Sequence, residues 1–297
     1  MLGVVSGVEG GGWWALAEAW PWLALVAGAV AALLLALRLG RRRRGARRAR
    51  LRRAGPRYPV VLAHGLLGFD EIRIGAYRRR YFRGVPERLE KDGCVVHACR
   101  VAKTASIADR AAELAAFVQA IPARRVNLVA HSMGGLDARY ALSKLGLSRK
   151  VASLVTVGTP HLGTPLADLG SGLERRTRMW SALARLGVNV DAFHDLTTAR
   201  MADFNARVPD ARGVLYASVV GAPPRRREVS PILLPSWIWL ERAAGANDGM
   251  VPAASQRWGE VVWQIGADHL AQIGWSRRFD AAELYAEVLR ELRDRGL

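Results

Sequence analysis

The sequence predicts an α/β fold, in which a mostly parallel sheet carries helices on both of its faces. Apolar runs of strand length alternate with longer segments of helical periodicity, and this alternation is typical of parallel sheets. The expected strands are residues 58–63, 93–101, 126–130, 151–157, 214–220 and 261–265. The expected helices are residues 106–121, 133–145 and 279–293. A chain of 297 residues that is 51% hydrophobic is long enough for one sizeable core.

Local signals mark the ends of these elements. Residues 58–63 (YPVVLA) form a short continuous apolar run before Gly65, as expected of a buried strand. Ser106 and Asp109 resemble a capping box at the start of the next helix. Pro122 ends that helix, because proline cannot continue the backbone hydrogen-bond pattern.

Residues 164–212 have an irregular pattern that is rich in short helical pieces. The stretch follows a strand, where open α/β folds place segments that cover a ligand, so we expect a lid. Within it, residues 173–190 alternate apolar side chains with arginines, which favours a basic amphipathic helix suited to an anionic lipid surface. A second apolar segment lies at 232–240. Ordinary core packing explains both segments equally well.

The strongest chemical signal is the segment 126–135 (VNLVAHSMGG). A strand, the pattern small-x-Ser-x-Gly and a helix follow one another, and this order places Ser132 on a tight turn at the edge of the sheet. The helix then directs its first amides and its positive dipole end at a developing oxyanion. Ala130 replaces the usual first glycine but is still small. We expect Ser132 to be a nucleophile, and an ordinary serine in a strand-to-helix turn is the alternative.

An acyl-transfer site also needs two amide donors for the carbonyl oxygen. One should be the N–H of Met133, which follows the nucleophile. The other should come from the loop after the first strand, residues 63–70 (AHGLLGFD), with Leu66 as the expected donor. Gly65 and Gly68 permit unusual backbone angles there. His64 would then shape this loop rather than act as a base.

After such a serine, the chain order should be acid and then histidine. Asp248 lies in a turn, residues 247–252 (NDGMVP), and His269 follows the last strand. His269 would take the Ser132 proton and return it to the leaving alcohol, while Asp248 would fix the tautomer of the imidazole. The competing acid is Asp268. The competing bases are His161, His194, His97 and His131.

The chain resembles the pseudomonad-type true lipases of bacteria, which belong to the α/β-hydrolase superfamily. The matching stretches, in chain order, are residues 64–70, 126–135, 158–163, 247–249 and 269–270. The resemblance implies an α/β-hydrolase fold with a helical lid that opens at a lipid surface. It implies hydrolysis of acylglycerol esters by Ser132, Asp248 and His269, with Leu66 and Met133 as oxyanion donors. It also matches Arg110 to an arginine that braces the oxyanion loop, although an arginine on the helix surface is the alternative.

The sequence departs from this family at the structural calcium site. Family members bind calcium through two aspartates, one of them two residues after the catalytic histidine, where Ala271 stands. Residues 228–235 offer no aspartate for the second position. A hard dication needs several oxygen ligands, so we expect neither calcium nor any other cofactor. Cys94 and Cys99 do not fall where the family's disulfide lies, and we expect both to be free.

The first 55 residues differ in composition from the rest. Residues 20–37 carry no charge, and a helix needs about 20 apolar residues to span a bilayer. Ten arginines between Arg38 and Arg53, against two acids, give the segment +8 of the net charge of +18. We expect a membrane anchor and linker at 1–55 and the catalytic domain at 56–297, on the cytoplasmic face by the positive-inside rule. An unusual export signal or a misassigned start is the alternative.

The sequence thus predicts a membrane-associated lipase or carboxylesterase. A phospholipase or an acyltransferase could use the same triad. An inactive membrane-anchored binding module is the third alternative, and the intact triad positions argue against it. The expected partners are a lipid ester substrate and a membrane surface, with no obligate protein partner. Nucleic acid is not expected, because no aromatic residues or binding motif accompany the arginines.

Overall fold

The computed structural model describes residues 55–66, 71–74, 77–101, 106–173 and 194–297; the side chains of 71–79 and 170–173 are outside this description. The chain separates into two units, Met1–Arg50 and Leu51–Leu297, and every described residue belongs to the second. All statements below concern this second unit.

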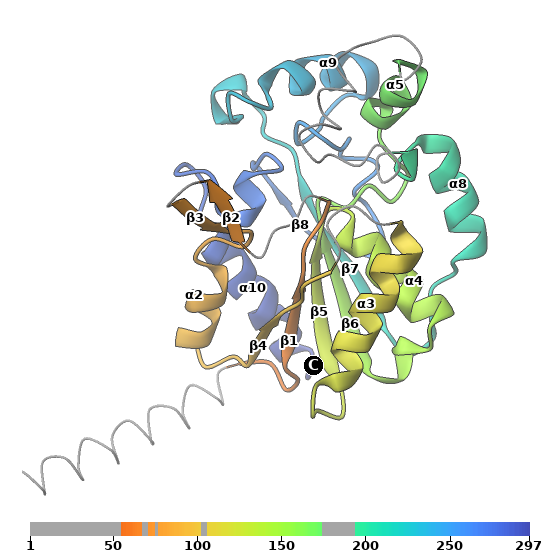
Figure 1. Cartoon of the computed structure of the whole chain (residues 1–297). Coiled ribbons are helices and arrows are strands. Elements are labelled where there is room, and N and C mark those ends of the chain that lie inside the picture. The colour runs from red at the N-terminus through yellow and green to blue at the C-terminus, as the bar shows by residue number, and fades with distance from the viewer. Residues whose placement is uncertain (1–54, 67–70, 75–76, 102–105, 174–193) are drawn as a thin grey trace, which may run out of the picture. The chain divides into compact units, whose positions relative to one another are not determined.

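A six-stranded sheet forms the centre of the fold, in the order β4-β1-β5-β6-β7-β8. Every neighbouring pair of its strands is parallel, which confirms the predicted α/β fold (Figure 1). The strands are β1 (Val60–Ala63), β4 (Val96–Ala98), β5 (Val126–His131), β6 (Val151–Val157), β7 (Leu215–Gly221) and β8 (Glu260–Ile265). A separate antiparallel pair, β2 (Glu71–Ile74) and β3 (Tyr77–Arg80), was not expected from the sequence.

Helices cover both faces of the sheet (Figure 1). Side chains alternate between the faces along each strand, so Val60 and Leu62 pack with α2 (Val85–Lys91) and α10 (Ala281–Asp294). Their neighbours Val61 and Ala63 pack instead with α3 (Ile107–Ala120) and α4 (Gly134–Lys144). The two resulting cores hold the sheet from both sides and fix the ends of its strands.

The predicted cap of the first long helix is present. The Ser106 hydroxyl oxygen accepts a hydrogen bond from the Asp109 amide, and α3 runs to Ala120, with Ile121 as its C-cap. The last helix begins in the same way, because the Asp280 carboxylate accepts from the Glu283 amide. Such caps satisfy amides that have no partner within the first helical turn.

The predicted lid region is described in part. Its first helix is α5 (Pro165–Leu173) and its last is α8 (Thr198–Arg207). Residues 174–193 lie outside the described residues, and with them most of the amphipathic helix expected at 173–190. The second apolar segment forms α9 (Leu234–Ala244), which packs against α5. Helices α5 and α9 lie together in Figure 1, and the lid function stays a prediction.

The expected location, a single-pass membrane protein with its catalytic domain on the cytoplasmic face, is wrong. In the part of the chain that the structure describes, no helix is both long enough and apolar enough to cross a membrane. Its longest described helices, α3 and α10, have 14 residues each and bury one face in the core, whereas a span needs about 20 apolar residues. The apolar run at 20–37 lies outside the described residues.

Candidate active site

Ser132 occupies the sharp turn between β5 and α4. Its φ is 56°, and among the described residues no other non-glycine residue has a positive φ. Two glycines after it let the strand and the helix approach closely. A Cβ on Gly134 would lie 2.7 Å from the His64 carbonyl oxygen, and one on Gly135 would lie 2.3 Å from Thr159 Oγ1. A rare backbone conformation of this kind costs about 1–3 kcal/mol and is concentrated at functional sites.

Three loops bring Ser132, His269 and Asp248 together. The Ser132 hydroxyl donates to His269 Nε2 over 3.0 Å, and His269 Nδ1–H donates to Asp248 Oδ2 over 2.7 Å. A backbone hydrogen bond from the His269 amide to the Asp248 carbonyl oxygen, 2.9 Å long, ties two of the loops together. Ser132 and His269 are each 9% exposed and Asp248 is fully buried, so the acid is shielded while the other two reach a cavity.

Hydrogen bonds compensate for the burial of the Asp248 carboxylate. Its Oδ1 accepts from the amides of Met250 (2.9 Å) and Val251 (2.7 Å). Its Oδ2 accepts from Gln272 Nε2 (3.0 Å) in addition to His269. A buried charge is tolerated when its oxygens are satisfied in this way, and the acid is therefore held in one orientation toward the imidazole.

The two expected oxyanion donors lie next to Ser132. The amides of Leu66 and Met133 donate no hydrogen bond to any described residue. Met133 is the N-cap of α4, where unpaired amides and the helix dipole favour negative charge. Gly65 does not have a positive φ. It is needed for close approach instead, because a Cβ there would lie 2.6 Å from Ser132 Cβ. Gly68 lies outside the described residues.

Arg110 braces the loop before Leu66. Its Nη2 donates to the His64 carbonyl oxygen (2.9 Å), and its Nε donates to Asp137 Oδ2 on α4 (2.9 Å). The guanidinium is fully buried, so the alternative of an arginine on the helix surface is wrong. His64 itself accepts a hydrogen bond at Nε2 from the Val101 amide. Both residues shape the oxyanion loop, which we define as residues 64–66.

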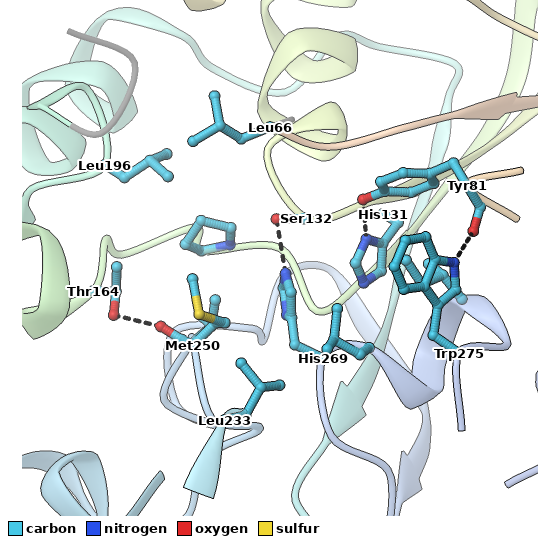
Figure 2. A pocket seen from close by; sticks show the side chains of 14 residues that line it. Leu66, Tyr81, His131, Ser132, Thr164, Leu196, Leu233, Met250, His269 and Trp275 are labelled. Atoms are coloured by element: carbon cyan, nitrogen blue, oxygen red, sulfur yellow. Dashed lines mark hydrogen bonds between the residues drawn. The ribbon is translucent and has the colours of Figure 1, made fainter. Parts of the chain in front are cut away.

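A cavity of about 290 Å³ opens beside Ser132 and His269 (Figure 2). Its wall is almost entirely apolar. The lining residues include Leu66, Leu196, Leu233, Met250, Leu270 and Trp275. A pocket of this kind binds an apolar ligand and leaves few polar groups to orient it. Here the polar side chains that line it are Tyr81, His131, Ser132, Thr164 and His269.

Comparison with known proteins places this geometry in a family. Residues 58–172 match a family described as alpha/beta hydrolase fold. Triacylglycerol lipase 2 of Saccharomyces cerevisiae is 30% identical over 271 residues, which cover 75% of this chain and 82% of the yeast protein. A triacylglycerol lipase of Pseudomonas fragi is 30% identical over 299 residues, which cover 81% of this chain and 98% of the relative. The chain belongs to the triacylglycerol lipase family of α/β-hydrolases.

Solved structures agree with this membership. A lipase of Bacillus licheniformis in mature form has a TM-score of 0.63 and 26% identity, and the match covers 80% of this chain and 92% of that one. A metagenomic carboxyl esterase has a TM-score of 0.68 at 23% identity, covering 82% and 76%, and shows the shared fold. The resemblance to pseudomonad-type lipases expected from the sequence is confirmed.

The competing acid and bases make other contacts. Of the six histidines, all of which lie in described segments, His269 is the one that hydrogen-bonds to Ser132. His161 is buried against Thr156 and stacks on Trp258. His97 lies in β4, and His194 precedes α8. Asp268 accepts from the amides of Leu270, Ala271 and Ser230 rather than from His269.

The residues of this chain do not fit the family's calcium site. Ala271 is apolar and buried, and the nearby Asp268 carboxylate is occupied by three backbone amides. Among the described residues, no group of three or more His, Cys, Asp or Glu side chains could hold a metal ion. Hydrogen bonds between protein groups, such as those to Asp268, hold the loop of His269 in place.

Sequence reasoning missed Tyr81 and Gln272. Tyr81 donates to His131 from the wall of the cavity, and Gln272 donates to the Asp248 carboxylate. Nothing in a single sequence marks either residue, because the first precedes an ordinary helix and the second lies in a short 3₁₀ turn, Ala271–Ile273. His131 is the remaining candidate base from the sequence analysis. Its contacts can be interpreted only together with Tyr81 and Gln272.

Proposed function

We propose that the chain hydrolyses carboxylic esters of lipids, with Ser132 as nucleophile, His269 as base and Asp248 as the acid that orients it. The observation that carries the proposal is the pair of hydrogen bonds from Ser132 to His269 (3.0 Å) and from His269 to Asp248 (2.7 Å) at the wall of an apolar cavity. Its relatives are named triacylglycerol lipases, which supports this substrate class.

The chemistry follows from these positions. Ser132 Oγ attacks the ester carbonyl carbon while its proton passes to His269 Nε2. The carbonyl oxygen becomes an oxyanion, for which the amides of Leu66 and Met133 are the donors. The tetrahedral intermediate then expels the alcohol, which takes the proton from His269 and leaves an acyl-serine. Water repeats the sequence, releasing the fatty acid and restoring Ser132.

The apolar lining favours the acyl chain over a polar substrate. Burying apolar surface contributes about 25 cal/mol per Å², so each further methylene that enters the cavity improves binding. The cavity of about 290 Å³ leaves room for a chain well beyond acetate. We therefore expect kcat/KM to rise from acetate toward esters of medium chain length.

We further propose that the surface around α5 and α9 contacts the lipid. Apolar side chains are exposed there, and they are Leu162 (49%), Leu169 (44%), Ile232 (77%) and Trp239 (36%). Next to them, Leu233 and Met250 form one apolar cluster with Leu270, and all three line the cavity. Exposed apolar patches beside a pocket are typical of interaction sites.

A substitution pair tests the surface contact. Ile232→Ser should weaken binding to emulsified triacylglycerol and leave hydrolysis of a dissolved short ester unchanged. Leu145→Ser is the matched control, because Leu145 is 37% exposed at the end of α4 and belongs to no such patch. Equal losses in the two variants would reject this surface.

The nucleophile is tested by covalent labelling of the full-length chain. A fluorophosphonate probe should label the wild type and the variant Ser276→Ala, whose serine is partly exposed and outside the site. It should not label Ser132→Ala. Labelling that persists in Ser132→Ala would refute the assignment. A series of p-nitrophenyl esters then separates lipase from esterase, and turnover of acetate and butyrate alone, even with detergent, would reject a lipid substrate.

A further inference from the structure

A buried histidine that the proposed reaction does not use lies beside the triad. His131 precedes Ser132, is 1% exposed, and its ring centroid lies 4.5 Å from that of His269. Burial lowers the pKa of His131 well below its usual value, and the neighbouring His269 lowers it further. His131 is therefore neutral at working pH. One of its ring nitrogens carries a proton and donates a hydrogen bond, and the other can accept a hydrogen bond.

Tyr81 determines which nitrogen accepts. The Gly65 amide donates to Tyr81 Oη over 3.1 Å, and Oη lies 2.7 Å from His131 Nδ1 (Figure 2). Burial raises the pKa of the Tyr81 hydroxyl, so it keeps its proton. That proton is donated to Nδ1, and the proton of His131 itself then lies on Nε2. The direction of donation runs from Gly65 through Tyr81 to His131.

The next hydrogen bond in this series would join His131 to Gln272. Neither His131 Nε2 nor Gln272 Oε1 hydrogen-bonds to another group among the described residues. The Gln272 side chain and the His269 backbone nonetheless raise the pKa of His131, as acceptors close to that ring do, and of these two Gln272 offers an unpaired acceptor atom. One atom is a donor and the other an acceptor. Leaving both unpaired in the interior is costly, and a hydrogen bond between them would satisfy both.

The fold is built around the Gln272 amide. A Cβ on Gly158 would lie 2.2 Å from Gln272 Oε1, and a Cβ on Gly221 would lie 2.0 Å from Gln272 Nε2. The amide therefore fits between two positions where only glycine leaves room. In this place Nε2 donates to Asp248 Oδ2 over 3.0 Å, the same oxygen that accepts from His269.

We propose that Tyr81, His131 and Gln272 are positioning residues that form one hydrogen-bond chain, running in a single direction from the Gly65 amide to the Asp248 carboxylate. The chain joins the oxyanion loop, which carries Leu66, to the acid that orients His269. It rests on the proposed function, because it positions the groups of that reaction. A protonated His131 would turn Nδ1 into a donor facing the Tyr81 hydroxyl, so the chain requires the neutral ring.

Single substitutions remove one link each. Tyr81→Phe removes the hydroxyl and keeps the ring, and Gln272→Met removes both polar atoms at similar length. Each should lower kcat on a dissolved ester about tenfold or more, with KM within about twofold, because the chain positions groups that act in the transition state. Tyr285→Phe is the matched control. Tyr285 is buried, whereas Tyr81 is partly buried, and the Tyr285 hydroxyl has no hydrogen-bond partner among the described residues.

The double variant Tyr81→Phe/Gln272→Met distinguishes a chain from two separate contacts. In a continuous chain the second break adds little, so the double variant should be about as slow as the slower single variant. Independent sites that share no partner contribute additively in free energy. A loss of activity equal to the product of the two single losses would overturn the proposal, as would an equal loss in Tyr285→Phe.

A second measurement needs no variant. The ¹⁵N chemical shifts of the His131 ring, measured in the wild type from pH 5 to 8, should show a neutral ring protonated at Nε2 throughout. A ring protonated at Nδ1, or a titration within this range, would overturn the chain. Absence of ester hydrolysis in the wild type would instead reject the proposed function, and the tautomer would remain an independent result.

Discussion

Gly65→Ala should damage catalysis without unfolding the protein. The φ of Gly65 is not positive, so alanine can adopt its backbone conformation. The new Cβ would lie 2.6 Å from Ser132 Cβ and 3.0 Å from both Ser132 Oγ and Tyr81 Oη. Opening the closest contact to 3.4 Å, the lower edge of ordinary contact, moves the two residues apart by about 0.8 Å. A displacement of this size at a reacting group costs about 10²-fold in rate.

We therefore expect kcat/KM of Gly65→Ala to fall about 100-fold, which corresponds to about 2.7 kcal/mol of transition-state stabilisation. The assay is steady-state hydrolysis of a p-nitrophenyl ester, with thermal unfolding measured alongside. Gly266→Ala is the control, because its Cβ would meet Pro224 Cδ at an ordinary 3.5 Å. A Gly65→Ala enzyme with wild-type kcat/KM would show that the oxyanion loop tolerates this shift, and the close-approach argument would fail.

Other predictions concern stability and metal. Arg110→Met leaves the buried Asp137 carboxylate without its cation, so unfolding free energy in urea should drop by about 3–5 kcal/mol. Arg88→Met, which breaks partly exposed pairs with Asp92 and Glu283, should cost less than about 1 kcal/mol, and equal losses would contradict the reasoning. The pKa values of His131 and His161 are lowered by burial, so below about pH 6.5 the unfolded state binds more protons than the folded state. Stability should therefore be full above that pH and fall as the pH decreases toward 5, and urea midpoints that do not change with pH would refute this. EDTA should leave hydrolysis and the thermal midpoint unchanged, and a loss that calcium restores would show that a metal ion is bound.

The sheet could be predicted from the sequence because buried parallel strands are apolar along their whole length. The run at 151–157 coincides with β6, in which every residue is buried. The edge strand was predicted less well, since 93–101 shortens to β4 (Val96–Ala98), whose residues are half-buried or exposed. The antiparallel pair of β2 and β3 escaped prediction, because each strand has only four residues and β3 (YRRR) is arginine-rich, although β2 (EIRI) does alternate polar and apolar residues.

The proposed site could be predicted where the chemistry constrains local sequence. Ser132 needs small neighbours on a tight turn, and Asp248 and His269 follow it in a fixed order, so the sequence alone suggests all three, and the structure places them within hydrogen-bond distance of one another. Gln272 was not found, because its role depends on contacts with residues far away in the chain. Gly65 was singled out for an incorrect reason. Glycine is needed there because a Cβ would collide with Ser132, and not because the backbone angles require it. Contacts of this kind exist only after folding.

The distance along the chain between the reacting groups has a consequence for refolding. Ser132 and His269 are separated by 137 residues, and their hydrogen bond forms across β5 and the loop after β8. Closing so long a segment is slow and requires that the intervening strands have already joined. Recovery of esterase activity after dilution from denaturant should therefore trail the return of helical circular dichroism, and turnover marks the last step of assembly.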